Sequence, residues 1–402
     1  MKRIVITGMG VASPIGNNAP QFEASLRLGR TGVKENHWHD TDGFASKYLG
    51  KIEGFESPKG LSKRQAKHCS IVDLYALAAA QEALESAQLS TDGKLGLTVG
   101  VVLGSGGAVS DTEAYVASSI KAQSKSPSKL LTTNPDSAGN AIAVRFGLHG
   151  PRSSIMTACS SGATAVGYAA DFLQEGYADV MLAGGVEGVS YVTLSGFNAL
   201  GALSSSKNRP FDLNRDGIVL GEASAVLVME TLEHALSRGA TILAEFVSYG
   251  LSSDANHITA PHPEGDGMVR AMLQALTRGG VGIEQILYIN AHGTGTALND
   301  KSESMAVKKV FGPHAYKLCM STIKPMIGHT LSAAGAIEAV ATVMSVQGQF
   351  APPTLNFETV DPDCGLDCVP NAARNLTMEY AMSNSLAFGG NNTSLIFKRY
   401  QE

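Results

Sequence analysis

Two helices built from small residues place the strongest constraint on how this chain folds. One follows Cys159 and begins with the sequence SGATA, and the other follows His329 and begins with LSAAG. Alanine and glycine let backbones approach closely, because their side chains occupy little or no space. We therefore expect both helices to be buried between sheets, at the centre of a layered core.

Short apolar segments alternate with helices along the rest of the chain. In the helix predicted over 70–88, apolar residues recur every three or four positions and form one face. The apolar segments are typical of strands, and they cover residues 4–6, 99–103, 180–183, 225–229, 242–247, 286–289, 318–322 and 393–397. This alternation predicts an α/β fold.

The order of these elements repeats in the second part of the chain. A helix, a strand and a glycine turn over 70–107 are followed by the same set of elements over 267–296. Such repetition indicates two similar halves, which we place at 1–245, with Cys159, and at 246–402. No proline- or serine-rich linker separates the halves, so we expect them to pack as one body.

Charge and composition exclude several classes of protein. The formal net charge of −5 gives no overall positive field that would hold nucleic acid. No window approaches about 18 uninterrupted apolar residues, so we expect no membrane span. The first residues are interrupted by glycine, serine and proline, unlike a signal peptide. Five cysteines without a Cys-x-x-Cys pair indicate reduced thiols, and we expect a cytoplasmic protein.

Two glycine-rich turns raise the question of nucleotide binding. Gly8 and Gly10 follow a strand, but the third glycine of a dinucleotide motif falls at Ser13, which Pro14 follows. The turn at Gly104 lacks the Gly-Lys-Ser/Thr of a phosphate loop. Neither turn supports a nucleotide site.

Cys159 is the first candidate for chemistry. It lies in the sequence TACSSG, directly before the first small-residue helix. Unpaired N–H groups and the positive dipole end at a helix amino terminus favour the thiolate, so we expect a lowered pKa for Cys159. A core cysteine without a chemical role is the alternative. The strand-turn-helix setting favours a nucleophile.

Two histidines in the second half follow strands and are surrounded by glycine: His292, in NAHGTGT, and His329, in KPMIGH. A turn histidine or a helix-capping histidine is the alternative for each. A zinc site would need further ligands, and none lies at metal-ligand spacing. A cysteine hydrolase would need only one histidine. A thiolate that holds an acyl group, with two neutral imidazoles that donate to an enolate oxygen, fits carbon-carbon bond formation at thioesters.

Five segments together resemble the β-ketoacyl-acyl carrier protein synthases of the thiolase-like superfamily. They are VITGMG with SPIG near the amino terminus, the Cys159 segment, the two histidine segments and NSLAFGGNN from Asn384. They match in order and span essentially the whole chain. The resemblance implies a thiolase-like five-layered αβαβα fold built from two duplicated halves, and usually a dimer.

The resemblance also implies a catalytic role for each matching residue. Cys159 would take the acyl chain, while His292 and His329 would assist decarboxylation of a malonyl-carrier thioester and stabilise the enolate. Lys324 and Glu338 match a lysine and an acid that pairs with it; a surface lysine is the alternative for Lys324. No metal or organic cofactor is implied, because the substrates arrive on the phosphopantetheine arm of acyl carrier protein.

The remaining implied roles concern substrate binding. The backbone N–H groups of Cys159 and Phe388 would form the oxyanion hole, with Phe388 also a gate. The substrate-binding positions are Thr294, Thr296, Gly107, Phe388 and Gly389. The small residues around Gly107 match the region that bounds the acyl cavity and suggest no bulky stop there.

A basic cluster would dock the acidic carrier protein. It comprises Lys63, Arg64 and Lys67, just before a predicted helix. The alternative is a solvated helix entrance with no partner.

Two departures from the family pattern occur near Phe388. Ala387 stands where glycine is usual, and Asn391 where threonine is common. If position 387 requires positive φ, alanine there costs on the order of 1 kcal/mol.

Other functions and assemblies stay open. A thiolase would need a second reactive cysteine in the carboxyl-terminal glycine-rich segment, which has none. A structural partner in a ketosynthase/chain-length-factor heterodimer should lack the nucleophile. Homodimer or heterodimer with a chain-length-factor-like homologue, and fatty-acid or polyketide and polyene elongation, are alternatives that the sequence does not separate.

Overall fold

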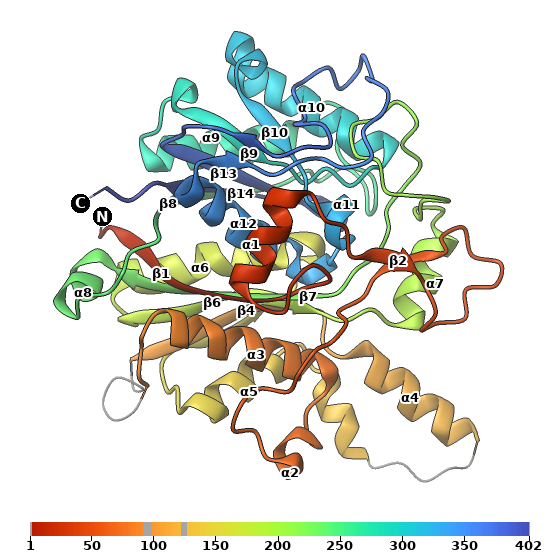
Figure 1. The fold of residues 1–402 in the computed structure, drawn as a ribbon, viewed down its shortest axis with the longest axis vertical. Coiled ribbons are helices and arrows are strands. Elements are labelled where there is room, and N and C mark those ends of the chain that lie inside the picture. Colours follow the sequence, from red (N-terminus) through yellow and green to blue (C-terminus); the bar gives the residue numbers. More distant parts are fainter. Residues whose placement is uncertain (1, 92–97, 122–126, 402) are drawn as a thin grey trace.

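A ten-stranded mixed sheet is the framework of the computed structural model, which describes residues 2–91, 98–121 and 127–401 (Figure 1). The strands are β1 (Ile4–Ala12), β2 (Val33–Glu35), β3 (Tyr48–Gly50), β4 (Val99–Ser105), β5 (Arg152–Ile155), β6 (Val180–Glu187), β7 (Ala223–Thr231), β8 (Ala244–Ser253), β9 (Ile286–Asn290), β10 (Cys319–Ser321), β11 (Phe350–Ala351), β12 (Arg374–Asn375), β13 (Tyr380–Leu386) and β14 (Asn391–Lys398). The helices are α1 (Ala19–Leu28), α2 (Lys63–Ala66), α3 (Ile71–Ser86), α4 (Val109–Ile120), α5 (Ser137–Phe146), α6 (Ser161–Glu175), α7 (Tyr191–Ala199), α8 (Leu232–Ser237), α9 (Asp266–Gly279), α10 (Ala297–Phe311), α11 (Lys324–Ile327) and α12 (Ala334–Gly348).

The strand order is the same in the two halves of the sheet. The order β5-β4-β6-β7-β1 on one side is matched by β10-β9-β13-β14-β8 on the other. The halves join where Ile4 of β1 pairs with Phe246 of β8, and Ile6 with Ala244. The duplication is thus a repeat of topology, and the division that we placed between 245 and 246 falls within β8.

Helices and half-sheets alternate in five layers (Figure 1). α3 packs on β1 and β7 at one outer face, and α9 packs on β8 and β14 at the other. α6 and α12 lie between the half-sheets and contact each other. The predicted αβαβα order is confirmed, with both small-residue helices at its centre.

Glycines set the distances between these layers. A Cβ added at Gly8 or Gly10 of β1 would lie 2.2 or 1.9 Å from a backbone oxygen of α3. These two glycines therefore serve packing. At the centre, a Cβ at Gly162 of α6 would lie 2.7 Å from a backbone nitrogen of α12, and one at Gly335 of α12 would lie 2.6 Å from a backbone nitrogen of α6. Larger residues would force the two central helices apart.

The two central helices begin in the same way. α6 follows the 3-10 helix η3 (Ala158–Ser160), and α12 follows η6 (Leu331–Ala333). Both turns begin with a non-glycine residue at positive φ, Ala158 at 49° and Leu331 at 46°. By this match, Ser332 corresponds to Cys159. His329, although it also precedes a small-residue helix, lies outside the repeated turn.

The predicted elements are present, and β13 is the main strand that the sequence did not predict. All eight predicted strands are confirmed, and the helix predicted over 70–88 is α3. The sequence of β13, YAMSNSL, has three adjacent polar residues, which are buried. Within the described ranges, Leu331–Gly348 has the length and hydropathy of a membrane span, but 83% of it is buried as a core helix.

The close approach of α6 and α12 makes Gly335 sensitive to added volume. Gly335→Ala should lower the free energy of unfolding by about 1–3 kcal/mol, because the new Cβ overlaps α6. Urea denaturation measures the change. Gly196→Ala in α7 is the matched control, since a Cβ there meets nothing within 4 Å and alanine favours a helix. Equal stability of Gly335→Ala and wild type would contradict the packing.

Candidate active site

Cys159 lies in η3, at the turn between β5 and α6. The residue is 6% exposed. The backbone N–H of Phe388 donates a hydrogen bond to its sulfur. Phe388 begins the 3-10 helix η7 (Phe388–Gly390), which follows β13. The thiol therefore comes from the first half of the chain, and its hydrogen-bond donor from the second.

Burial raises the pKa of the Cys159 thiol to about 11. The positive charge of Lys324 and the N–H of Phe388 favour the thiolate, but burial outweighs both. The expected lowering of this pKa is therefore wrong for the resting site, because the helix amino terminus is itself buried. The resting group is a neutral thiol, which must lose its proton as it attacks a substrate.

His292 lies on the loop between β9 and α10. Glu303 of α10 accepts hydrogen bonds from the backbone N–H groups of His292 and Gly293, both at 2.8 Å. Lys324 Nζ donates to the His292 carbonyl oxygen and lies 3.4 Å from His292 Nδ1. Because an ammonium group can only donate, Nδ1 is the acceptor, and the proton of the neutral ring is on Nε2.

His329 lies between α11 and η6, and its ring meets that of His292. The ring centroids are 5.3 Å apart, with the planes at 82°. The backbone N–H of Leu331 donates to His329 Nδ1 at 3.2 Å, which again leaves the ring proton on Nε2. Burial, and then the charge of Lys324, lower the pKa of both imidazoles well below its usual value. Both histidines are thus neutral N–H donors, as the sequence predicted.

Lys324 and Glu338 form a buried ion pair. Both side chains are 1% exposed, and Lys324 Nζ donates to Glu338 Oε1. The predicted pairing is confirmed, and the surface alternative for Lys324 is wrong. Burial raises the pKa of Glu338 to about 7, although the charge of Lys324 opposes this shift. The pair contacts the site through the carbonyl oxygen and ring of His292.

A pocket of about 360 Å³ opens over these residues. The predicted site residues that line it are Cys159, His292, Thr294, Thr296, His329 and Phe388. Gly107 and Gly389, also predicted to bind substrate, are not among its lining residues. All five cysteines are described, and only Cys159 lines the pocket. The pocket lining therefore contains no second cysteine of the kind that a thiolase needs.

The loop after β13 is held by the neighbouring elements. The Phe388 ring stacks on Phe197 of α7, with centroids 5.7 Å apart. The N–H of Gly389 donates to the Ile258 carbonyl oxygen at 2.7 Å. Ala387 is extended, at φ −138°, so alanine causes no backbone strain at this position and the cost that we considered does not arise. Positive φ occurs instead at the two glycines after Phe388.

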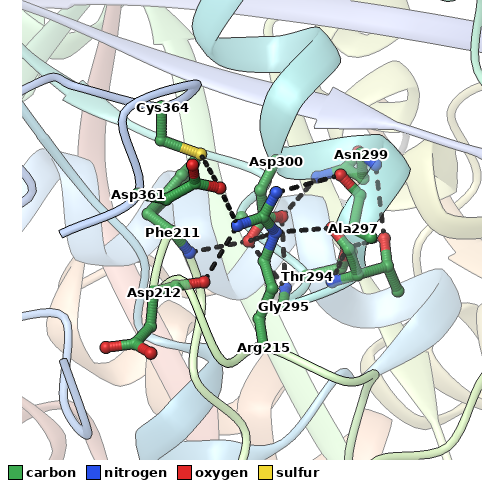
Figure 2. A network of polar contacts seen from close by, with 12 residues as sticks. Phe211, Asp212, Arg215, Thr294, Gly295, Ala297, Asn299, Asp300, Asp361 and Cys364 are labelled. Atoms are coloured by element: carbon green, nitrogen blue, oxygen red, sulfur yellow. Dashed lines mark hydrogen bonds and ion pairs between the residues drawn. The ribbon is translucent and has the colours of Figure 1, made fainter. Parts of the chain in front are cut away.

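Arg215 is the centre of a network of buried charges beside the pocket (Figure 2). Its side chain is 6% exposed and lies between the carboxylates of Asp361 and Asp300. Nη1 donates to Asp361, and Nε lies 3.9 Å from Asp300 Oδ2. On the other side of Asp361, Cys364 Sγ lies 3.7 Å from Oδ2. One buried guanidinium thus lies against two carboxylates and donates a hydrogen bond to Asp361.

The same network holds the loop over 294–297, which we call the threonine loop. Arg215 donates to two of its carbonyl oxygens, at 3.2 and 3.1 Å. Asp300 accepts a hydrogen bond from one of its N–H groups at 3.2 Å. The hydroxyl oxygens of Thr294 and Thr296 lie 2.9 Å apart, and both residues line the pocket. Arg215 therefore holds the backbone of the threonine loop, and this backbone in turn places the two threonine hydroxyl groups.

The predicted docking and acyl-cavity residues lie outside the pocket. Lys63, Arg64 and Lys67 are exposed on and after α2, and none of them lines the pocket. Gly107 has φ of 77°, and a Cβ there would lie 2.1 Å from the Thr133 carbonyl oxygen. Glycine at 107 is thus required by the packing of the turn. Its role beside the acyl chain stays a prediction.

Comparison with known proteins agrees with this geometry. Residues 1–235 match the model of the β-ketoacyl synthase N-terminal domain, and residues 243–358 match that of the C-terminal domain. The chain belongs to the β-ketoacyl synthase family. A 3-oxoacyl-[acyl-carrier-protein] synthase 2 of Synechocystis sp. is 39% identical over 412 residues, with 100% of this chain and 99% of that protein covered. This β-ketoacyl synthase is therefore a condensing enzyme of the acyltransferase type.

Solved structures of ketosynthases share the whole fold. The ishigamide ketosynthase/chain length factor has a TM-score of 0.94 at 36% identity. The type II PKS complex AntDE:AntF, of an acyl-carrier protein with its ketosynthase, has a TM-score of 0.89 at 31% identity. Each comparison covers 100% of both chains. The thiolase-like fold of this synthase is thereby shown.

Three residues of the synthase site were not predicted from its sequence: Glu303, Phe197 and Arg215. Glu303 accepts hydrogen bonds from backbone N–H groups of a turn, and such contacts produce no distinctive residue spacing in the sequence. Phe197 meets Phe388 only because α7 and η7 come together in the fold. Arg215 stands in the charged segment RPFDLNRDG, between α7 and β7, and this concentration of charge was the available signal.

Loss of Arg215 should weaken the binding of carrier-bound substrate. Arg215→Gln leaves two buried carboxylates without their cation, and the threonine loop loses two hydrogen bonds. We expect the KM for acyl-carrier substrate to rise about tenfold, in line with about 1.5–3 kcal/mol for hydrogen bonds to charged groups. Steady-state kinetics measures the change.

The control removes an ion pair on the surface. Arg374→Gln breaks the contact with Asp367, whose side chain is 39% exposed, and KM should stay at the wild-type value. The alkylation rate of Cys159 should be unchanged in both variants. An unchanged KM in Arg215→Gln would contradict its positioning role.

Proposed function

We propose that this synthase elongates acyl chains by decarboxylative Claisen condensation. An acyl group on Cys159 would react with malonyl-acyl carrier protein to give 3-oxoacyl-acyl carrier protein. One observation carries the proposal: the Cys159 thiol shares a pocket with His292 and His329, whose ring protons are both on Nε2. A nucleophile that holds one substrate, with two N–H donors for the enolate of the other, meets the needs of this reaction.

The first half-reaction transfers the acyl group to Cys159. The sulfur attacks the thioester carbonyl carbon, and the backbone N–H groups of Cys159 and Phe388 donate to the developing oxyanion. The bond between the carbonyl carbon and the phosphopantetheine sulfur then breaks. The thiol proton ends on the departing phosphopantetheine thiol, so one thioester is exchanged for another without net proton change. The N–H of Phe388, which bonds the sulfur at rest, is already beside the reacting group.

The second half-reaction forms the carbon-carbon bond. Loss of CO2 from the malonyl thioester leaves an electron pair that is shared with the thioester oxygen as an enolate. The Nε2–H groups of His292 and His329 donate to this oxygen, and each such donor is worth about 3 kcal/mol. The enolate carbon attacks the acyl-Cys159 carbonyl carbon, the bond to sulfur breaks, and the released thiolate takes one proton from solvent.

Lys324 would keep the histidines in the form that the reaction needs. Its charge lowers the pKa of both imidazoles, so neither carries a proton on Nδ1. Because Lys324 is itself buried and paired with Glu338, it supplies positive charge without entering the pocket. We therefore assign Lys324 and Glu338 as positioning residues. The proposed chemistry requires no metal or organic cofactor.

Acyl carrier protein is the partner that we propose for both substrates. The relative from Synechocystis is named for acyl-carrier-protein substrates, and the AntDE ketosynthase is bound to its acyl-carrier protein. Lys63, Arg64 and Lys67 are exposed and offer positive charge to such a carrier. The pathway would be fatty-acid elongation, or elongation of a type II polyketide or polyene.

A dimer across β5 completes the proposal. β5 is the last strand at one edge of the sheet, and its backbone groups on that side are open to pairing. Met156, which follows β5, is 69% exposed although apolar. The partner would be a second copy or a chain-length-factor homologue, as in the ishigamide ketosynthase/chain length factor.

Charge reversal tests the docking residues. Lys63, Arg64 and Lys67 replaced together by glutamate should raise the KM for acyl-carrier substrate, because an acidic carrier would be repelled, while kcat is retained. The control reverses three exposed basic residues of the second half, Lys309, Lys317 and Arg399. An unchanged KM in the first variant, or an equal rise in both, would remove the docking assignment.

Intact-mass analysis tests the two half-reactions separately. Cys159→Ala should gain no acyl mass from acyl-carrier substrates, because the acceptor sulfur is absent. His292→Ala and His329→Ala should gain the acyl mass and then fail to release it with malonyl carrier, with condensation slowed by about 100-fold or more. Acyl mass on Cys159→Ala, or normal condensation by both histidine variants, would contradict the mechanism.

A further inference from the structure

Glu187, at the end of β6, is a buried acid that the proposed reaction does not use. The residue is 6% exposed. One of its carboxyl oxygens, Oε2, lies 2.6 Å from Ser332 Oγ and accepts a hydrogen bond from the Ser332 N–H at 3.3 Å. Ser332 is the counterpart of Cys159 in the second half of the chain. Its turn, η6, directly follows His329.

The hydroxyl group of Ser332 has two neighbours and one proton. Besides Glu187 Oε2, it lies 2.8 Å from the Val186 carbonyl oxygen, which can only accept. If Glu187 were ionised, one of these two short oxygen-oxygen contacts would have no proton between them. If Glu187 is protonated, its O–H donates to Ser332 Oγ, and Ser332 donates to Val186. Only the protonated acid satisfies both contacts.

We propose that Glu187 is a neutral carboxylic acid that positions the η6 turn beside His329 and keeps negative charge away from Cys159. The inference rests on the proposed roles of Cys159 and His329. Leu331, in the same turn as Ser332, donates the hydrogen bond that fixes the His329 tautomer. The chain of hydrogen bonds from Glu187 to Ser332 to Val186 ties this turn to β6.

The groups around Glu187 favour the neutral form. Glu222, which precedes β7, opposes negative charge on Glu187, and its own carboxyl group contacts Lys51 at 2.6 Å and the Tyr75 hydroxyl at 3.2 Å. The turn after β4 packs closely on this carboxyl group, since a Cβ at Gly106 would lie 3.2 Å from Oε2. A negative charge at Glu187 would therefore be buried and opposed by Glu222.

The raised pKa of Glu187 also favours the neutral acid. Burial raises its pKa to about 7, although the hydrogen bonds from Ser332 and Gly188 oppose this shift. Negative charge on Glu187 in turn raises the pKa of Cys159. Below pH 7 the acid is neutral and the effect is absent; as pH rises through 7, ionisation makes the Cys159 thiol harder to deprotonate and removes the proton that Ser332 accepts.

Glu187→Gln separates this role from a merely structural one. The amide keeps the shape of the protonated acid, and its NH2 group can donate to Ser332 Oγ at every pH. We expect the rate of Cys159 alkylation by iodoacetamide, followed by peptide mass, to equal that of wild type at about pH 6 and to exceed it roughly threefold or more at about pH 8. Glu85→Gln, an exposed acid bonded to Gln81, is the control and should match wild type at both.

Infrared difference spectroscopy of the whole enzyme reports the proton directly. Of the carboxylic acid C=O bands present at about pH 6, one should weaken as pH rises through about 7 and be absent in Glu187→Gln, while the band of Glu338, whose pKa is also raised to about 7, remains. A spectrum without that band, or a rate ratio that does not change with pH, would overturn the inference. Neither readout requires condensation, so failure of the proposed function would appear separately, as acyl mass on Cys159→Ala.

Discussion

The close crossing of α6 and α12 determines where the reacting groups lie. Gly162 and Gly335 let the backbone of each helix approach the other, where larger residues would overlap. Because η3 and η6 begin these helices, the crossing brings the turn that carries Cys159 beside the turn that follows His329. The first half of the chain supplies the thiol that lines the pocket, and the second half supplies both imidazoles. The proposed condensation site therefore requires both halves of the chain to pack together.

Burial then leaves Cys159, His292 and His329 without charge in the resting site. It raises the pKa of Cys159 and lowers the pKa of His292 and His329, so the thiol and both rings are neutral. Lys324 is paired with Glu338 and contacts the site through His292, and Arg215, which lines the pocket, is paired with Asp361. In the proposed reaction, negative charge would develop beside the thiol and the two rings only during the chemical steps, and fixed N–H groups would stabilise it.

The sequence predicted the features that are local. A few consecutive residues are enough to recognise a small-residue helix, a strand with an apolar run, or a cysteine or histidine segment. It did not predict features that depend on distant packing. The raised pKa of Cys159 comes from the layers that bury it, and Ser332 meets Glu187 only because η6 packs on β6. β13 was missed because three adjacent polar residues interrupt its apolar run, although the packed sheet buries all three.

The protonation of His292 and His329 is the most direct test of the account. Nitrogen-15 spectra of histidine-labelled enzyme, with each ring assigned from its alanine variant, report charge and tautomer at the same time. The account predicts two neutral rings with the proton on Nε2 and no titration between about pH 6 and about pH 8. A ring that titrates near its ordinary pKa of about 6.5, or carries its proton on Nδ1, would contradict it.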